Sequence, residues 1–240
     1  KKIFGDEYEL IMPKAKYVSD ISDEIWETCE GILAWHDLEY SKDTIIKLEN
    51  CKGIVRVGTG YDNIDLDAAK DNNIVVSNIP DYGTNDVADH TLALILSLER
   101  NIIKFNQSIK NNGPWSWGLG KNLNRIQDMY FGIIGLGRIG TAVAIRAKAF
   151  GMKVAFYDPY IPIGFEKSLD LYRKHSLNEL LKESDIISIH TPLTTETKGM
   201  VNSRFFKMMK TGSSLINTAR GEIVVMDNLY HALKEYKIKS

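Results

Sequence analysis

Short apolar runs alternate with amphipathic stretches along the first third of the chain. Residues 32–36 and 53–58 are mostly apolar, and the segment between them, 41–48, has the apolar spacing of a helix. A second helical pattern covers residues 65–72, and residues 74–77 form another apolar run. Continuous apolar runs of this length are typical of strands buried in a parallel sheet. We therefore expect the first third of the chain to form a small α/β layer of its own.

The pattern breaks at a segment with a proline and a glycine just before residue 84. Apolar positions then recur at helical spacing from residue 84 to about 106, and Thr84 or Asn85 is the expected N-cap. This break predicts two domains, one over residues 1–83 and one over residues 84–240.

Strands and helices alternate regularly from residue 129 onward. Apolar runs at 130–134 and 153–157 flank a helical pattern at 141–150. The later expected segments are a helix at 177–182, a strand at 184–190, a helix at 203–209, a strand at 213–217 and a helix at 226–236. This alternation predicts an α/β fold with a doubly wound parallel sheet.

A glycine cluster joins the first strand and helix of this alternation. Gly135, Gly137 and Gly140 follow the G-x-G-x-x-G spacing. The first glycine permits a tight turn, the second lets the backbone approach a pyrophosphate, and the third lets the helix pack closely on the strand. The helix N-terminus then faces the phosphates with unpaired N–H groups and the positive end of its dipole. The cluster predicts a dinucleotide-binding site.

Asp158 indicates which dinucleotide binds. It ends the second strand, 18 residues after Gly140, where a carboxylate can accept hydrogen bonds from an adenosine ribose. The same carboxylate would repel a 2′-phosphate. We therefore expect NAD rather than NADP as the cofactor.

Two further strands end in residues that can carry chemistry. In an open α/β sheet, ligands bind beyond the carboxyl ends of the strands, which places segments 190–192 and 218–221 near the ligand. The planar, permanently charged guanidinium of Arg220 matches a carboxylate, so it can bind and polarise an α-keto acid. The alternative is that Arg220 is an ordinary surface arginine.

Charge and composition exclude several classes of partner. Thirty basic and 31 acidic residues give a net charge of −1, so no strong field attracts nucleic acid or an anionic membrane. No apolar run is long enough to span a membrane. Cys29 and Cys51 do not have metal-ligand spacing, so we expect no metal and two reduced thiols in a cytoplasmic protein. Small molecules are the expected partners.

Four motifs together resemble one enzyme family. They are residues 55–65 (Val-Arg-Val-Gly-Thr-Gly-Tyr-Asp-Asn-Ile-Asp), 135–140, 190–194 and 217–221. Their order over essentially the whole chain is similar to that in the D-isomer-specific 2-hydroxyacid dehydrogenases. The resemblance implies a Rossmann cofactor domain and a smaller, flavodoxin-like α/β substrate domain. It also implies hydride transfer between NAD and a D-2-hydroxy acid/2-oxo acid pair, in a cleft between the two domains.

The resemblance assigns roles to residues at matching positions. Arg220 would be catalytic and would bind the substrate carboxylate and the 2-oxo group. Thr59 and Gly60 would hold that carboxylate through backbone N–H groups, with Arg56 as a further substrate-binding residue. The residues expected along the cofactor are Gly135, Gly137, Arg138, Ile139, Gly140, Asp158, Thr191, Pro192, Thr218, Ala219 and Arg220.

The family also uses a histidine as general acid or base on the 2-oxygen, and a glutamate that raises the pKa of this histidine. The family's pattern places both residues beyond Ser240, together with the last elements of the cofactor domain, so we expect this chain to lack them. His190 is not the expected substitute, because it stands at the end of a strand on the cofactor side.

Two alternatives to a general 2-hydroxyacid dehydrogenase follow from local similarities. Segment 81–90 resembles the bacterial branch related to C-terminal binding proteins, which would allow a non-enzymatic, NAD(H)-sensing regulatory protein, although Arg220 argues against a purely structural role. Residues 58–60 also resemble D-3-phosphoglycerate dehydrogenases of serine biosynthesis, although no extra cationic groups for a substrate phosphate are evident near Thr59. The resemblance further implies a homodimer through the cofactor domain, with Trp115 and Trp117 in a dimer arm.

Overall fold

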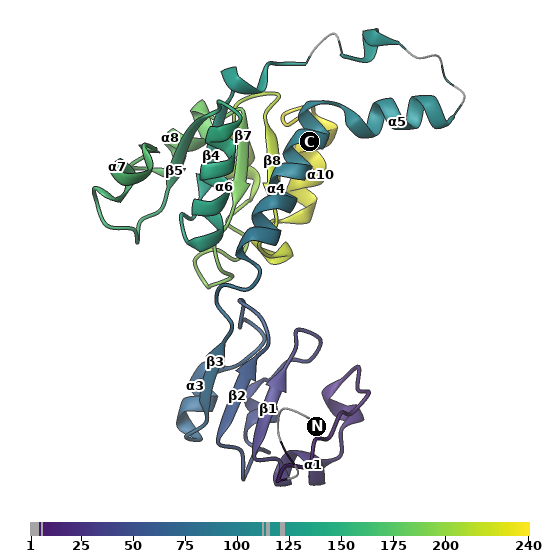
Figure 1. The fold of residues 1–240 in the computed structure, drawn as a ribbon, viewed down its shortest axis with the longest axis vertical. Helices are drawn as coiled ribbons and strands as arrows, with labels where there is room; N and C mark the ends of the chain where they lie inside the picture. The colour runs from purple at the N-terminus through teal and green to yellow at the C-terminus, as the bar shows by residue number, and fades with distance from the viewer. Residues whose placement is uncertain (1–4, 6, 112, 114–115, 121–122) are drawn as a thin grey trace. The chain divides into compact units, whose positions relative to one another are not determined.

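The computed structural model describes residues 5, 7–111, 113, 116–120 and 123–240. The chain divides into two compact units, Lys1–Tyr82 and Gly83–Ser240, and strands alternate with helices in both (Figure 1).

The unit Lys1–Tyr82 contains a three-stranded parallel sheet in the order β1-β2-β3. Gly31 lies opposite Gly53, which in turn lies opposite Val75. The elements of this unit are η1 (Val18–Asp20), α1 (Asp23–Thr28), β1 (Gly31–Ala34), α2 (Lys42–Ile45), β2 (Gly53–Arg56), α3 (Leu66–Asp71) and β3 (Val75–Asn78).

One face of this sheet is buried and the other is exposed. Ile54 packs in the core of the unit with residues of the surrounding helices. Leu33, Val55 and Val75 point to the opposite face, and Val75 is 71% exposed. The prediction that segment 74–77 is a fully buried strand is therefore wrong for this face, since side chains alternate between the two sides of a strand.

The unit Gly83–Ser240 contains a five-stranded parallel sheet in the order β6-β5-β4-β7-β8. Its helices are α4 (Thr84–Glu99), α5 (Ile102–Lys110), α6 (Arg138–Ala149), α7 (Phe165–Leu169), α8 (Leu177–Glu183), α9 (Ser203–Met208) and α10 (Met226–Lys234), with 3-10 turns η2 (Trp117–Gly120), η3 (Ile126–Asp128) and η4 (Gly221–Ile223). Its strands are β4 (Tyr130–Ile134), β5 (Lys153–Tyr157), β6 (Tyr172–Arg173), β7 (Ile186–Ile189) and β8 (Ser214–Asn217).

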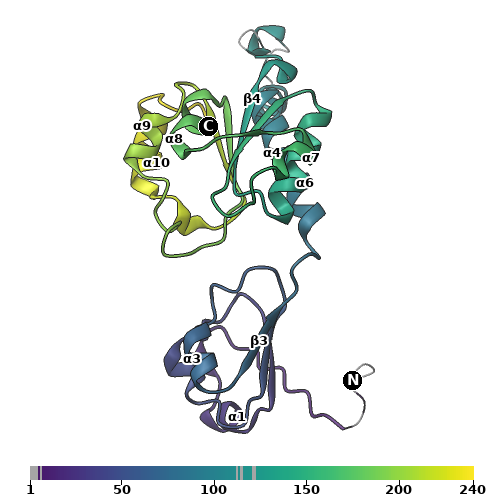
Figure 2. The ribbon, with the colours of Figure 1, turned by 90° about the vertical axis from the view of Figure 1, so that its left-hand side faces the viewer.

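Helices cover both faces of the five-stranded sheet, as Figure 2 shows. Helices α4 and α6 pack on one face around Phe131 and Phe156. Helices α8, α9 and α10 pack on the other face around Ile187 and Ile189. The predicted α/β fold with a doubly wound parallel sheet is confirmed.

The strand order reverses direction at β4. The chain runs outward from β4 through β5 to β6, then returns to the other side of β4 with β7 and β8. In open α/β sheets, ligands bind at this switch point, beyond the carboxyl ends of the two central strands. The loops after β4 and β7 are therefore the first places to examine for a ligand site.

The helix predicted from residue 84 to about 106 is in fact two helices, α4 and α5. Between them Asn101 adopts a left-handed conformation with φ of 51°, and its side chain donates to the carbonyl of Leu119. Apolar periodicity continues across this break, so the sequence pattern does not reveal it. The predicted N-cap is also wrong, because the cap residue is Gly83 and not Thr84 or Asn85.

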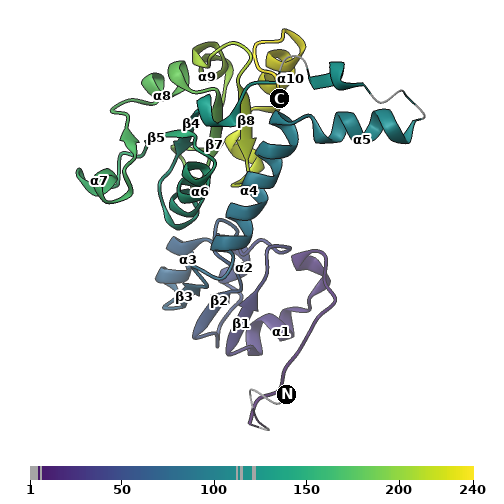
Figure 3. The same cartoon turned by 45° about the horizontal axis from the view of Figure 1, so that its top comes forward.

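Helix α5 extends away from the sheet of its unit (Figures 1 and 3). The predicted dimer-arm residue Trp115 lies outside the described residues, and Trp117 begins η2. Sequence patterns also missed α1, α7 and the two-residue strand β6. Among the described helices, none is both long and apolar enough to cross a membrane.

A buried carboxylate ties α4 to the last residues of the chain. Glu99, at the end of α4, accepts hydrogen bonds from Ser214 Oγ at 2.7 Å and from Lys239 Nζ at 2.6 Å. Next to this pair, Ile238 forms a parallel bridge with Ser213 at the entrance to β8. Because a buried charge is costly unless it is paired, these contacts fix α4 against the edge of the sheet.

Candidate dinucleotide-binding site

The glycine cluster forms a tight turn between β4 and α6. Gly135 has a φ of 88°, and a Cβ at this position would lie 2.9 Å from the carbonyl oxygen of His190 at the end of β7. A Cβ on Gly140 would overlap the carbonyl oxygen of Gly135. Residues without side chains are therefore required for α6 to begin directly beside the ends of β4 and β7.

Gly137 differs from these two glycines because nothing lies within 4 Å of where its Cβ would be. It is exposed and serves as the N-cap of α6, without a side-chain cap. The first bond of the helix runs from Thr141 N to the carbonyl of Gly137, so the N–H groups of Arg138 and Ile139 precede the helical ladder. Open space next to helix N-terminal donors fits a pyrophosphate.

The Asp158 carboxylate is held directly against the glycine turn. Its Oδ2 accepts from Leu136 N at 2.8 Å, and its Oδ1 accepts from Tyr160 N at 2.9 Å. A carboxylate oxygen can accept two hydrogen bonds, so both oxygens keep acceptor capacity. Asp158 is partly exposed, and its carboxylate therefore fits an adenosine ribose with free hydroxyl groups.

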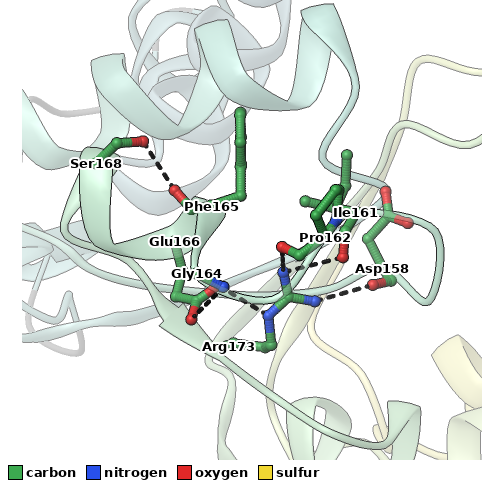
Figure 4. Close-up of polar contacts among 8 residues, drawn as sticks. All are labelled: Asp158, Ile161, Pro162, Gly164, Phe165, Glu166, Ser168 and Arg173. Atoms are coloured by element: carbon green, nitrogen blue, oxygen red, sulfur yellow. Dashed lines mark hydrogen bonds and ion pairs between the residues drawn. The ribbon is translucent and has the colours of Figure 1, made fainter.

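The loop that follows Asp158 is organised by Arg173 of β6, as Figure 4 shows. The guanidinium donates to the carbonyl groups of Asp158 (3.3 Å), Ile161 (3.2 Å) and Pro162 (2.7 Å), and its Nε pairs with Glu166 at 2.9 Å. The Arg173 side chain is 11% exposed. Because one partly buried cation satisfies four acceptors, it fixes the backbone that carries Asp158.

No sequence signal identified Arg173, since most of its acceptors are backbone carbonyls that any residue supplies.

A second unpredicted contact joins the loops after β5 and β7, where Tyr160 Oη donates to Glu196 Oε2 at 2.5 Å. The hydrogen bond to the Glu196 carboxylate raises the pKa of Tyr160. The two loops that flank the glycine turn are thus connected at their exposed ends.

His190 and Thr191 follow β7 and face the turn. Burial lowers the pKa of His190 to about 4, so the ring is neutral at pH 7, and its Nε2 lies 2.8 Å from Ser188 Oγ. A ring with so low a pKa is a weak base, in agreement with a structural role. The Thr191 hydroxyl oxygen is buried without a hydrogen-bond partner among the described residues, and Pro192 is exposed.

Residues after β8 form a turn that places Arg220. The side chain of Asn217 accepts from Ala219 N at 3.0 Å and donates to the carbonyl of Arg220 at 2.8 Å. Thr91 of α4 donates to the carbonyl of Val87, and its oxygen lies 3.1 Å from the hydroxyl of Thr218. Since Thr91 has one proton to donate, Thr218 is the donor in this second contact.

Arg56, Thr59 and Gly60 lie in the unit Lys1–Tyr82. Arg56 is buried, and its Nη1 donates to the carbonyl of Val57 at 2.7 Å. A Cβ on Gly58 would overlap the same guanidinium. The carbonyl of Thr59 accepts from Asn78 Nδ2 at 2.7 Å, so the end of β3 supports this loop.

The cofactor residues predicted from the sequence lie at the ends of strands of the five-stranded sheet or in the first turn of α6. The structure brings Gly135, Asp158 and Thr191 together around one turn. The hydroxyl of Thr218 instead lies 3.1 Å from the hydroxyl of Thr91 in α4. In the part of the chain that the structure describes, no cluster of three or more histidine, cysteine or carboxylate residues could hold a metal ion.

Comparison with known families gives one match that covers more than half of the chain. Residues 92–240 match the model of the D-isomer specific 2-hydroxyacid dehydrogenase, NAD binding domain. This range includes the glycine turn, Asp158 and Arg220.

Individual relatives agree with this match. The chain is 40% identical to a D-3-phosphoglycerate dehydrogenase of Methanocaldococcus jannaschii over 200 residues, which cover 83% of this chain and 38% of the relative. It is 37% identical to a D-3-phosphoglycerate dehydrogenase of Bacillus subtilis over 220 residues, 91% of this chain and 41% of the relative. The chain thus spans about two fifths of the length of these relatives.

Among solved structures, the fold is similar to that of D-lactate dehydrogenase from Aquifex aeolicus in complex with NAD and lactic acid. The TM-score is 0.88 at 36% identity, and the match covers 93% of this chain and 66% of that one.

The open space beside Gly137 leads to a first prediction. Gly137→Ala places a methyl group where the pyrophosphate is expected, so NADH affinity should fall at least about tenfold, as measured by fluorescence titration. The φ of −72° suits alanine, and the Tm should therefore stay within about 2 °C of the parent value.

Gly83→Ala is the matched control, because its Cβ also meets nothing within 4 Å, at the N-cap of a different helix. It should leave NADH affinity unchanged. Equal affinities for Gly137→Ala and the parent chain would show that the pyrophosphate does not lie beside Gly137.

Proposed function

Because this chain belongs to the D-isomer specific 2-hydroxyacid dehydrogenase family, we propose that it acts in NAD-dependent oxidation and reduction of a D-2-hydroxy acid/2-oxo acid pair. The observation that carries this proposal is the position of Arg220. It follows β8, at the same edge of the sheet as the glycine turn, so a cation suited to a carboxylate stands at the edge where the cofactor binds.

NAD, when bound, would supply the nicotinamide that accepts or donates the hydride. The chain's own contribution is to hold and orient it. The N-terminus of α6 binds the pyrophosphate in the space beside Gly137, and Asp158 accepts hydrogen bonds from the adenosine ribose. Because Leu136 and Tyr160 already fix the Asp158 carboxylate, the acceptor is positioned before the cofactor arrives.

Arg220 binds the substrate carboxylate through its planar fork and polarises the adjacent 2-oxo group. The turn made by Asn217 fixes the backbone of Arg220, which limits the directions in which the guanidinium can reach. Thr59, Gly60 and Arg56 are proposed as further substrate-binding residues on the basis of their motif.

The relatives favour one specific substrate pair. The relatives from Methanocaldococcus jannaschii and Bacillus subtilis are D-3-phosphoglycerate dehydrogenases, so we propose D-3-phosphoglycerate and its 2-oxo product as the first pair to test. The similar solved structure is a D-lactate dehydrogenase, which makes lactate and pyruvate the natural comparison.

Arg220 provides the test of substrate binding. The complex with NADH is titrated with 3-phosphohydroxypyruvate and with pyruvate by calorimetry, and NADH absorbance is followed for turnover. Arg220→Ala should weaken binding of the preferred 2-oxo acid by about tenfold to a hundredfold, because a charge-assisted contact to the carboxylate is lost.

Arg204→Ala, which removes an exposed arginine of α9 in the same unit, is the control and should bind like the parent chain. If Arg220→Ala binds and turns over 2-oxo acids as well as the parent does, Arg220 is not part of the substrate site. If neither 2-oxo acid binds the parent complex, the proposed substrate class is wrong.

Asp158 provides the test of cofactor selectivity. Asp158→Asn removes the negative charge with little change in shape, so repulsion of a 2′-phosphate disappears. One oxygen remains to accept from the ribose, and one of the two backbone contacts, to Leu136 N or Tyr160 N, is lost. The ratio of the Kd for NADPH to the Kd for NADH should fall about tenfold, because like charges in contact are strongly unfavourable. Asp170→Asn, an exposed residue paired with Lys148, should leave this ratio unchanged. An unaltered ratio in Asp158→Asn would contradict the assignment of the ribose.

We also propose that two copies of the chain associate through the unit Gly83–Ser240, which we call the cofactor unit because it contains the proposed cofactor site. Helix α5 exposes Ile102 (51%), Ile103 (56%) and Ile109 (57%), which is unusual for a helix that faces water alone. Light scattering should give a mass near twice 27.1 kDa for the parent chain and a lower mass for Ile103→Glu combined with Ile109→Glu. Leu233→Glu on α10 is the control, and a dimer that survives the double substitution would exclude α5 as the interface.

A further inference from the structure

The two cysteines lie on neighbouring segments at the entrance to the sheet of the unit Lys1–Tyr82. Gly31 of β1 pairs with Gly53 of β2, and one residue earlier Lys52 N donates to the carbonyl of Glu30 at 2.9 Å. The segments that precede β1 and β2 therefore also lie side by side. Cys29 and Cys51 come directly before Glu30 and Lys52 on these two segments.

Side-chain contacts join the two segments on both sides of the cysteines. They are Lys47 Nζ to Asp23 at 2.6 Å, Asn50 Nδ2 to the backbone carbonyl of Glu27 at 2.6 Å, and Lys52 Nζ to Glu30 at 3.2 Å. Cys29 lies between Glu27 and Glu30 in the sequence, and Cys51 lies between Asn50 and Lys52. The contacts therefore hold the two cysteine-bearing segments side by side.

This placement matches the geometry of a disulfide. Neighbouring strands lie about 4.8 Å apart, and the Cα atoms of disulfide-linked cysteines are usually about 4.4–6.8 Å apart. Both cysteines are free, and each thiol donates to a backbone carbonyl, Cys29 Sγ to Trp26 at 3.4 Å and Cys51 Sγ to Gly53 at 3.4 Å. Cys51 belongs to the hydrophobic core of the unit, and Cys29 packs against that core.

The surroundings of the pair favour reaction at one sulfur. The neighbouring Cys29 thiol lowers the pKa of Cys51 to about 7, and the Cys51 thiol raises the pKa of Cys29. Cys51 is 7% exposed, whereas Cys29 is half-buried, so the pair lies just beneath the surface. A thiolate next to a second thiol is the arrangement in which oxidation ends in a disulfide.

We propose that Cys29 and Cys51 form an oxidation site, at which a hydroperoxide converts the dithiol into a reversible intrachain disulfide. The Cys51 thiolate attacks one peroxide oxygen, which gives a sulfenic acid and, with hydrogen peroxide, one water after proton uptake. The Cys29 sulfur then attacks the Cys51 sulfur, its proton leaves with the displaced hydroxide as a second water, and the S–S bond forms. In total, two thiols and one hydrogen peroxide give one disulfide and two waters.

The disulfide would join the end of α1 to the entrance of β2 and close a loop that contains β1 and α2. Because the two segments are already paired in the reduced form, closure requires little movement of the backbone. Constraint of the unfolded chain then stabilises the unit, and the Tm should rise by roughly 5–15 °C. This site is independent of the proposed cofactor site, because it lies in the other unit.

The test is oxidation of the fully reduced, folded chain with hydrogen peroxide. The intact mass should fall by about 2 Da through loss of two hydrogens, both thiols should stop reacting with a maleimide, and dithiothreitol should reverse both changes. Digestion should give one cross-linked peptide pair that contains Cys29 and Cys51. The oxidised chain should remain a single chain on a non-reducing gel.

Cys29→Ala and Cys51→Ala test whether both thiols are needed. Cys29→Ala should gain oxygen atoms at Cys51 instead of losing hydrogens, and Cys51→Ala should form no intrachain cross-link. The proposal fails if the folded parent chain keeps both thiols under peroxide, gains oxygen atoms without a cross-link, or forms disulfides only between chains. Because the cross-link is read from the parent chain, the outcome does not depend on the folding of either variant.

Discussion

The cofactor unit depends on one close approach between backbone and backbone, that of Gly140 to the carbonyl group of Gly135. A single methyl group at either position would collide, at Gly140 with the Gly135 oxygen and at Gly135 with the carbonyl of His190. Because neither glycine has a side chain, α6 starts directly at the ends of β4 and β7, where the strand order reverses. The donors of the helix N-terminus are thereby aimed into the position at which an open α/β sheet binds its ligand.

Polar side chains then fix the loops around this turn. Asp158 joins the loop after β5 to Leu136 in the turn, and Arg173 holds the backbone on the far side of Asp158. Asn217 performs the same task for Arg220. In each case a side chain satisfies backbone groups that would otherwise be unpaired, and this keeps an exposed loop in one conformation. A site of this kind holds its ligand-binding groups in place before a ligand binds, which lowers the entropic cost of binding.

In the unit Lys1–Tyr82, polar contacts also hold segments that are far apart in the sequence against one another. Contacts between the segments that precede β1 and β2 hold these segments side by side, and each segment carries one cysteine, Cys29 or Cys51. A covalent bond between them would therefore reinforce an arrangement that noncovalent contacts already select.

The sequence by itself determined the class of fold, the glycine turn and the chemistry expected of Asp158, because apolar periodicity and glycine spacing report local backbone geometry. It did not reveal the break at Asn101, since a left-handed residue interrupts a helix without interrupting its apolar pattern. It also did not find the contacts of Arg173, the pairing of Thr91 with Thr218 or the proximity of the segments that carry Cys29 and Cys51. These depend on segments that are far apart in the chain and meet only after the sheet is assembled, and that is why the tertiary structure alone decided them.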